Sequence, residues 1–139
     1  MTVDILNTLV SSAIWRAEQL ADLGLETAIP AWLEVSKLEE ELAKQIPVKD
    51  SEGRIARRGA VRAALKANAP VRAQELMERY LAEAGIPGQL RAELRDLLKE
   101  DAKVLTEQFP FAAKYHKPNE LQVLVNELLQ RGPFRLAAA

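Results

Sequence analysis

The spacing of apolar residues is the feature that most restricts the fold of this chain. In the first segment, Leu6, Val10, Ala13 and Ala17 recur three or four positions apart, and Gly24 follows them. This spacing places apolar side chains along one face of a helix, and glycine commonly ends a helix. No segment shows the sustained alternation of apolar and polar residues that is typical of a strand. The sequence therefore predicts an all-α fold.

The same pattern recurs along the chain and predicts about six helices in a compact, bundle-like array. Pro30 and Pro70 suit the first turn of a helix, and Pro47 ends the second segment. Thr2 or Asp4 is expected to cap the first helix. Because the connections are short, successive helices are expected to be antiparallel neighbours. The helices predicted after the first run from about 30 to 46, 54 to 67, 70 to 84, 87 to 109 and 119 to 131.

The length of the chain fits a single domain. A domain commonly contains about 100–200 residues, and the sequence has 139. We expect one helical domain over residues 1–136. The last three residues, 137–139, are alanines that we expect to form a disordered or cloning-derived tail outside the fold.

Several classes of catalytic and metal-binding protein lack their required residues here. The chain has no cysteine and only one histidine, His116. This excludes thiolate chemistry, cysteine-ligated metals and the paired histidines of common zinc and di-iron sites. The six glycines form neither of the common phosphate-binding motifs. We therefore predict a protein that is not an enzyme, with no catalytic residues, no metal and no cofactor.

The N-terminal region contains no pattern typical of membrane insertion or secretion. Its uncharged apolar run over residues 5–15 is too short to cross a bilayer. Asp4 precedes this run and no basic residue does, unlike in a signal peptide. We expect a cytoplasmic protein with no membrane partner.

Charge is unevenly distributed along the chain. The net charge is -1, from 19 basic and 20 acidic residues. Residues 1–50 contain nine acidic and four basic residues, whereas residues 51–72 contain one acidic and six basic residues. The near-neutral total therefore combines an acidic N-terminal region with a short basic segment, and the two could complement each other within one chain or between two copies.

The basic segment is the candidate binding site. On a helix, four of its cations lie four residues apart and form one stripe, with Arg57 beside it. Alanines and a glycine form the neighbouring rows, which lets another backbone approach closely. One interpretation is a solvated face partly paired with Glu39, Glu40 and Glu41. The other is a site for nucleic-acid phosphate or an acidic protein partner. The residues in question are Arg54, Arg57, Arg58, Arg62 and Lys66.

Aromatic residues suggest two weaker candidates. Trp15 and Trp32 are expected to pack in the core, although an exposed tryptophan can anchor an interface. The segment 109–118 contains three aromatic rings, and His116 lies between two lysines. We favour a loop that its rings hold against the bundle, with a partner-binding loop as the alternative.

The sequence leads to two main hypotheses about function, and an enzyme that uses carboxylates in a helical pocket is a third that no cluster of residues in the sequence supports. The first is a non-enzymatic module for protein–protein interaction, as an adaptor, accessory or regulatory protein, with a protein partner or a second copy of itself. The alternative is a nucleic-acid-binding accessory protein that uses the basic helix at 54–67. Against this alternative, the sequence pI of about 5.9 is low for such a domain.

Overall fold

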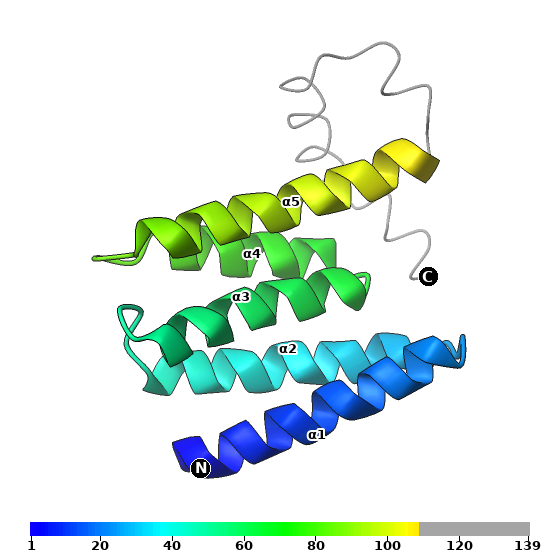
Figure 1. Cartoon of the computed structure of the whole chain (residues 1–139), viewed down its shortest axis with the longest axis horizontal. Helices are drawn as coiled ribbons and strands as arrows, with labels where there is room; N and C mark the ends of the chain where they lie inside the picture. Colours follow the sequence, from blue (N-terminus) through cyan, green and yellow to red (C-terminus); the bar gives the residue numbers. More distant parts are fainter. Residues whose placement is uncertain (109–139) are drawn as a thin grey trace.

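The computed structural model describes residues 1–108, with side-chain surroundings for residues 1–101, and this part of the chain is helical without strands (Figure 1). Five helices lie within it, which confirms the all-α prediction. The predicted sixth helix, the aromatic segment 109–118 and the tail at 137–139 lie outside the described residues. The helices are α1 (Val3–Asp22), α2 (Ala28–Gln45), α3 (Ser51–Lys66), α4 (Pro70–Leu81) and α5 (Gly88–Gln108).

Local chemistry at the helix ends explains most of these bounds. Thr2 caps α1 as predicted, because its hydroxyl oxygen accepts a hydrogen bond from the backbone N–H of Ile5 at 3.2 Å. After α1, Gly24 adopts φ 70°, a left-handed conformation that glycine reaches without strain. Pro70 is the first residue of α4, where a missing N–H leaves no bond unmade. That helix ends at Leu81, three residues before the predicted end.

The helices run alternately in opposite directions and pack mainly against their neighbours (Figure 1). α1 packs on α2, α2 packs on α3, and α3 packs on both α4 and α5. α2 therefore separates α1 from α3 over most of their lengths, and α1 lies at one end of the array with one helix beside it. This leaves much of the surface of α1 without a neighbour among the described helices.

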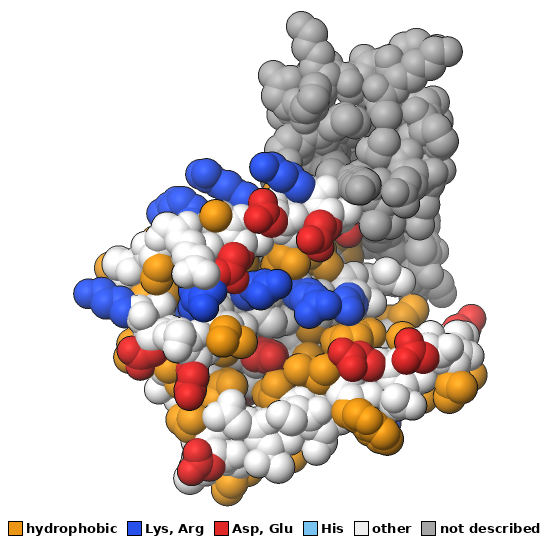
Figure 2. Space-filling model, viewed as in Figure 1, with side chains coloured by type: hydrophobic (Ala, Val, Ile, Leu, Met, Phe, Trp, Pro, Cys, Tyr) orange, Lys and Arg blue, Asp and Glu red, His pale blue; other side chains and the backbone are white. Residues whose placement is uncertain are grey.

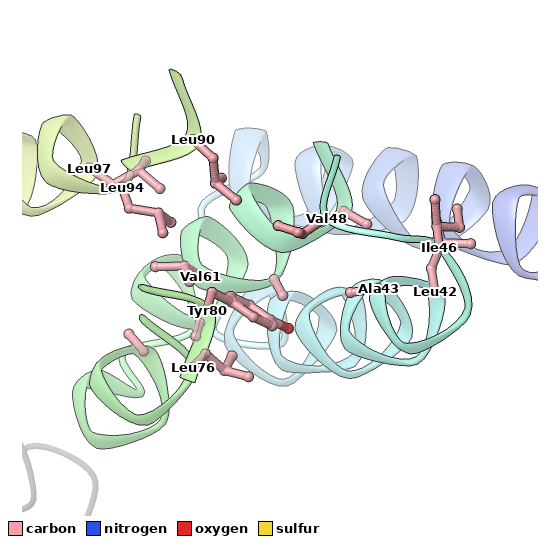
Figure 3. Packing of buried hydrophobic residues seen from close by; sticks show 14 of the residues in the cluster. Leu42, Ala43, Ile46, Val48, Val61, Leu76, Tyr80, Leu90, Leu94 and Leu97 are labelled. Atoms are coloured by element: carbon pink, nitrogen blue, oxygen red, sulfur yellow. The ribbon is translucent and has the colours of Figure 1, made fainter. Parts of the chain in front are cut away.

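Two apolar clusters hold the array together. The larger contains residues of all five described helices, and residues such as Leu42, Val61, Leu76 and Leu94 interlock in it (Figure 3). The smaller joins α1, α2 and α3, and Trp32 lies in it with 8% of its surface exposed. Small residues let α3 lie close to its neighbours, since the alanines at 56, 60 and 64 are each 1% exposed or less.

The prediction for the other tryptophan was wrong. Trp15 is 65% exposed, because it lies on the face of α1 opposite the buried stripe of Ala13 and Ala17. Its apolar neighbour Leu9 is also partly exposed, at 38%. Within the described residues, no helix is long and apolar enough to cross a membrane.

Candidate binding groove

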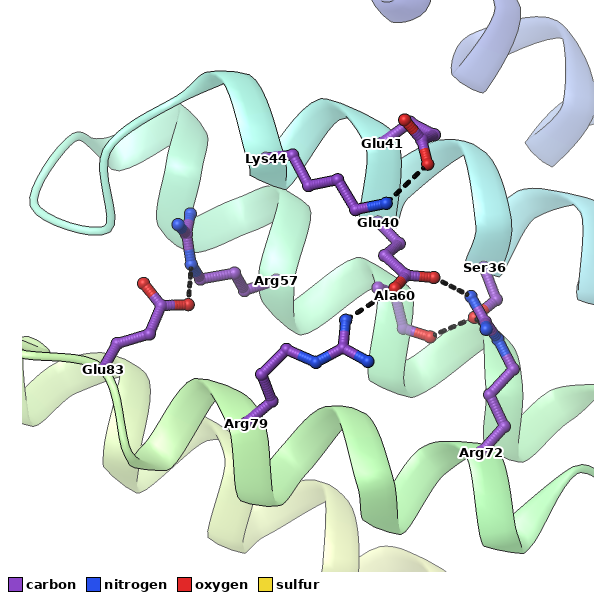
Figure 4. Close-up of polar contacts among 9 residues, drawn as sticks. All are labelled: Ser36, Glu40, Glu41, Lys44, Arg57, Ala60, Arg72, Arg79 and Glu83. Carbon is purple, nitrogen blue, oxygen red and sulfur yellow. Dashed lines mark hydrogen bonds and ion pairs between the residues drawn. The ribbon is translucent and has the colours of Figure 1, made fainter.

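The five predicted cations of α3 fall into two groups, and Arg57 belongs to the buried one. Its Nε donates a hydrogen bond to Oε1 of Glu83 at 2.8 Å (Figure 4). Its Nη1 donates to the backbone oxygens of Ile46 at 3.0 Å and Gly53 at 2.9 Å. Arg57 is 6% exposed, so its guanidinium ties α3 to the end of α2 and to the connection after α4, and it is not accessible to a partner.

Arg54 is also held inside the molecule. It forms an ion pair with Glu93 of α5, and its side chain is 20% exposed. Nε of Arg58 lies 3.5 Å from the other oxygen of Glu93, but the Arg58 side chain remains 47% exposed. Arg54, Arg57 and Arg58 do not pair with Glu39, Glu40 or Glu41, because they turn away from α2 toward Glu83 and Glu93. Of the basic segment, it is Arg72 that pairs with Glu40.

Arg62 and Lys66 continue the row toward the end of α3, and both are exposed. Neither forms an ion pair with another described residue. Nζ of Lys66 lies 4.4 Å from the ring centroid of Trp32, a cation–π contact. Partial burial and the positive charge of Arg62 lower the pKa of Lys66, against a smaller opposing effect of Glu18. Two cations thus lie close together at this end of the row, and Glu100 and Asp101 of α5 line a second cavity beside them.

A groove lies beside this row, between α1 and α3, with α2 as its floor. We call it the α1–α3 groove. Figure 2 shows the row of Lys and Arg side chains over α3, with hydrophobic side chains below it toward α1. The groove contains a cavity of about 170 Å³ that combines apolar surface with charged edges. Its lining is Ile14 and Glu18 from α1, Trp32, Val35 and Glu39 from α2, and Ile55, Arg58, Gly59, Arg62 and Ala63 from α3.

Glu39 forms the polar part of the groove floor. It is 5% exposed, and no described residue donates a hydrogen bond to its carboxyl group. Burial raises its pKa to about 7. The carboxyl group lies against Gly59 of α3, where an added Cβ would be 2.7 Å from the Glu39 Cδ atom. Gly59 therefore makes the space that this carboxyl group fills.

The sequence analysis missed Glu39 as a site residue. Glu39, Glu40 and Glu41 were expected only as partners of the basic segment, and because consecutive helical residues point about 100° apart, the sequence alone does not say which of them is buried. One signal was present, since a glycine inside a helix costs about 1 kcal/mol relative to alanine and often has a packing reason. Gly59 lies in the interior of α3, and its reason is contact with Glu39.

Glu40, on the opposite side of α2, is fully paired. Its two carboxylate oxygens accept hydrogen bonds from Arg72 at 2.7 Å and Arg79 at 2.6 Å, both from α4 (Figure 4). Burial alone would raise its pKa, but the bonds from Arg79 and Arg72 outweigh this and hold the pKa below its usual value. Arg72 also donates to Ser36, whose hydroxyl donates to the Ala60 carbonyl at 2.7 Å. This network joins α2, α3 and α4.

Over the described residues, no three acidic or histidine side chains gather as metal ligands would. Comparison of the sequence and fold with protein-family models, curated proteins and solved structures gave no match. The interpretation of the α1–α3 groove therefore depends on its own geometry and charge.

Proposed function

We propose that this chain is a non-enzymatic protein-interaction module whose α1–α3 groove binds an acidic helical segment. The observation that carries this proposal is that Arg58, Arg62 and Lys66 are exposed beside an apolar groove. The other two cations of the sequence prediction, Arg54 and Arg57, are engaged by Glu93 and Glu83, so we leave them out of the binding surface.

The spacing of the row suits a helical partner. Cations four residues apart on a helix recur about every 6 Å along its axis. A second helix with carboxylates four residues apart matches that repeat when the two axes lie close to parallel. Apolar residues of the same partner would cover Ile14 and Ile55 at the groove and gain the free energy of burial. Charge would then guide the encounter, and apolar contact would retain the partner.

A protein segment suits this surface better than a nucleic acid does. A phosphate chain carries a charge on every nucleotide and would also meet the carboxyl groups of Glu18 and Glu39, whereas a helix can direct its carboxylates to the cations and its apolar residues to the groove. The apolar floor also offers little to a phosphodiester backbone. The nucleic-acid hypothesis therefore enters the experiment below as a competing outcome.

Fluorescence anisotropy tests the proposal with a labelled 20-residue peptide probe. The peptide carries glutamates four residues apart on one helical face and leucines beside them, and a scrambled peptide of equal composition is the reference. We expect the patterned peptide to bind, and Arg62→Glu with Lys66→Glu to weaken binding at least about tenfold. Lys37→Glu is the matched control, because Lys37 is an exposed cation of α2 that does not line the groove.

Two results would count against the proposal. Equal binding of the patterned and scrambled peptides, or equal loss in the Lys37→Glu control, would show attraction by overall charge alone. Tighter binding of a labelled single-stranded oligonucleotide, lost in the Arg62→Glu, Lys66→Glu variant, would favour the nucleic-acid alternative.

A further inference from the structure

The exposed tryptophan of α1 lies next to the α1–α3 groove. Trp15 follows Ile14, which lines the groove, and is 65% exposed. Large exposed aromatic side chains are unusual on a monomer and are enriched among residues that dominate binding interfaces. Ile5 and Leu9 of the same helix are also exposed, at 51% and 38%. The outer surface of α1 is thus better suited to contact with protein than with water.

The cavity at Glu39 has the size and chemistry to receive one such side chain. Its volume of about 170 Å³ is below the roughly 300 Å³ of typical small-molecule sites, and a cavity of about 150 Å³ can hold a benzene ring. Val35 and Ile14 supply apolar walls, and the Glu39 carboxyl group is an acceptor without a donor. A ring with an N–H group at its edge would fill the space and supply that donor.

Acidic residues of α1 and basic residues of α3 have the same spacing along their helices. Glu18 and Asp22 follow Trp15 by three and seven positions, and both acids are exposed. Arg62 and Lys66 follow the Gly59 position of the cavity by the same three and seven positions. If α1 of another copy lies parallel to α3, with its tryptophan at the cavity, both carboxylates therefore face the two cations.

A twofold arrangement allows this contact to be made twice. In Figure 1, α1 and α3 run in the same direction on either side of α2. A rotation of 180° about an axis along the groove therefore brings α1 of each copy over α3 of the other without reversing either helix. Ile14 and Glu18, which come before and after Trp15 on α1, both line the cavity at Glu39, so Trp15 lies at the same level along the groove, as such an exchange requires.

We propose that the α1–α3 groove binds α1 of a second copy of this chain, with Trp15 inserted beside Glu39, to form a twofold dimer. This inference rests on the proposed function, because it uses the same groove and names its occupant. Each copy inserts one tryptophan, and the acidic surface of α1 covers the cationic edge of α3.

Sedimentation velocity of the full chain over a range of concentrations tests the dimer. We expect a dimer at tens of micromolar protein. Trp15→Ala should raise the dissociation constant of this dimer by about 30-fold or more, as for an interface hot spot. Val71→Ala is the matched control, since Val71 is an apolar residue of α4 that is 39% exposed and does not line the groove. That variant should sediment as the parent chain does.

A charge exchange provides a second, independent measurement. Asp22→Lys alone and Lys66→Glu alone should each weaken the dimer several-fold, and combining them in one chain should restore most of the loss. Restoration identifies the pair across the interface, which a general effect on folding would not produce. No restoration would overturn the register, and assembly beyond a dimer would overturn the twofold arrangement.

The same samples separate this inference from the proposed function. The Trp15→Ala chain should still bind the acidic peptide probe, because its groove is intact and no longer occupied. A parent chain that binds the peptide but stays monomeric would overturn the dimer and leave the proposed function standing. A parent chain that does neither would overturn both, and a dimer unaffected by Trp15→Ala would overturn the role of the tryptophan.

Discussion

The two sides of α2 show how differently one helix can use two adjacent glutamates. On the side toward α4, Glu40 accepts hydrogen bonds from Arg72 and Arg79. On the side toward the groove, Glu39 is buried against Gly59 with no donor among the described residues. On the side toward α4 the carboxylate is fully paired within the fold, whereas the groove side leaves polar groups and cations that a partner can engage. The carboxyl group of Glu39, which no described residue pairs, thus distinguishes the groove side of α2 from the side that faces α4.

The two carboxyl groups also give opposite pH dependences to stability. Burial raises the folded-state pKa of Glu39 from 4.5 to about 7, so the folded state favours its protonated form. Its stabilising contribution is complete below pH 4.5 and is lost as the pH rises toward 7. The pKa of Glu40 is lowered, so its contribution is present above pH 4.5 and is lost as the pH falls below that value.

Glu39→Gln should have the largest effect on stability, because it removes the titrating group on the groove side of α2. Glutamine keeps the shape but cannot ionise, so the variant should gain about 3–4 kcal/mol over the parent chain at pH 8, from roughly 1.4 kcal/mol per pKa unit and a shift from 4.5 to about 7. At pH 4 the two chains should differ little. Urea unfolding followed by circular dichroism at both pH values measures this. Equal gains at pH 4 and pH 8 would contradict a titrating Glu39. The groups facing it are Glu18, Arg58 and Arg62.

Glu40→Gln should act in the opposite direction. The variant removes the charge that pairs with Arg72 and Arg79, and we expect a loss of about 2 kcal/mol at pH 7. Because the paired carboxylate of the parent chain is itself protonated at low pH, the difference should shrink toward pH 3. The same urea experiment measures it, and a neutral or stabilising effect at pH 7 would remove the contrast between the two sides.

Gly59→Ala tests whether the glycine makes space for Glu39. Its Cβ would meet the Glu39 carboxyl group and displace it toward water. We expect the pH dependence of stability between 4.5 and 7 to weaken, because an exposed carboxyl group regains its ordinary pKa. In a Glu39→Ala background the same substitution should stabilise by about 1 kcal/mol through helix propensity. A double-mutant cycle measures the coupling, and purely additive effects would show that the two residues do not interact.

Arg79→Ala should have the smallest effect. The Arg79 side chain is 55% exposed, whereas that of Arg72 is 24% exposed and also bonds to Ser36. We expect a loss of less than about 1 kcal/mol for Arg79→Ala and a larger loss for Arg72→Ala. Thermal unfolding of the two variants side by side checks the order. The reverse order would show that burial does not govern the strength of this network.

Much of the fold could be predicted because helix formation depends on local pattern. Apolar spacing located the helices, and the Thr2 cap and Pro70 fixed two boundaries. Whether an individual side chain is buried or exposed could not be predicted, since this depends on which helices become neighbours. Trp15 is exposed because α1 packs mainly on α2, and a periodic pattern does not report how many neighbours a helix has.

The candidate site could likewise be predicted only in part. Arg58, Arg62 and Lys66 were found from their spacing on one helix. Arg57 shares that segment but points toward Glu83, which is 26 residues away in sequence. Such long-range pairing is set by tertiary packing, which also decides that Glu39 and Glu40 lie in opposite environments. Spacing alone therefore identified the cationic row but not its free members.

The two tryptophans of this chain lie in such different environments that their intrinsic fluorescence can be told apart. Trp15 is open to water, while Trp32 is buried beneath the Lys66 ammonium group. Emission at long wavelength and easy quenching by acrylamide should therefore belong to Trp15, and Trp32 should contribute a bluer, protected component. The proposed insertion of Trp15 into the groove of a second copy can then be followed without a label, as a shift of the exposed component toward the buried one.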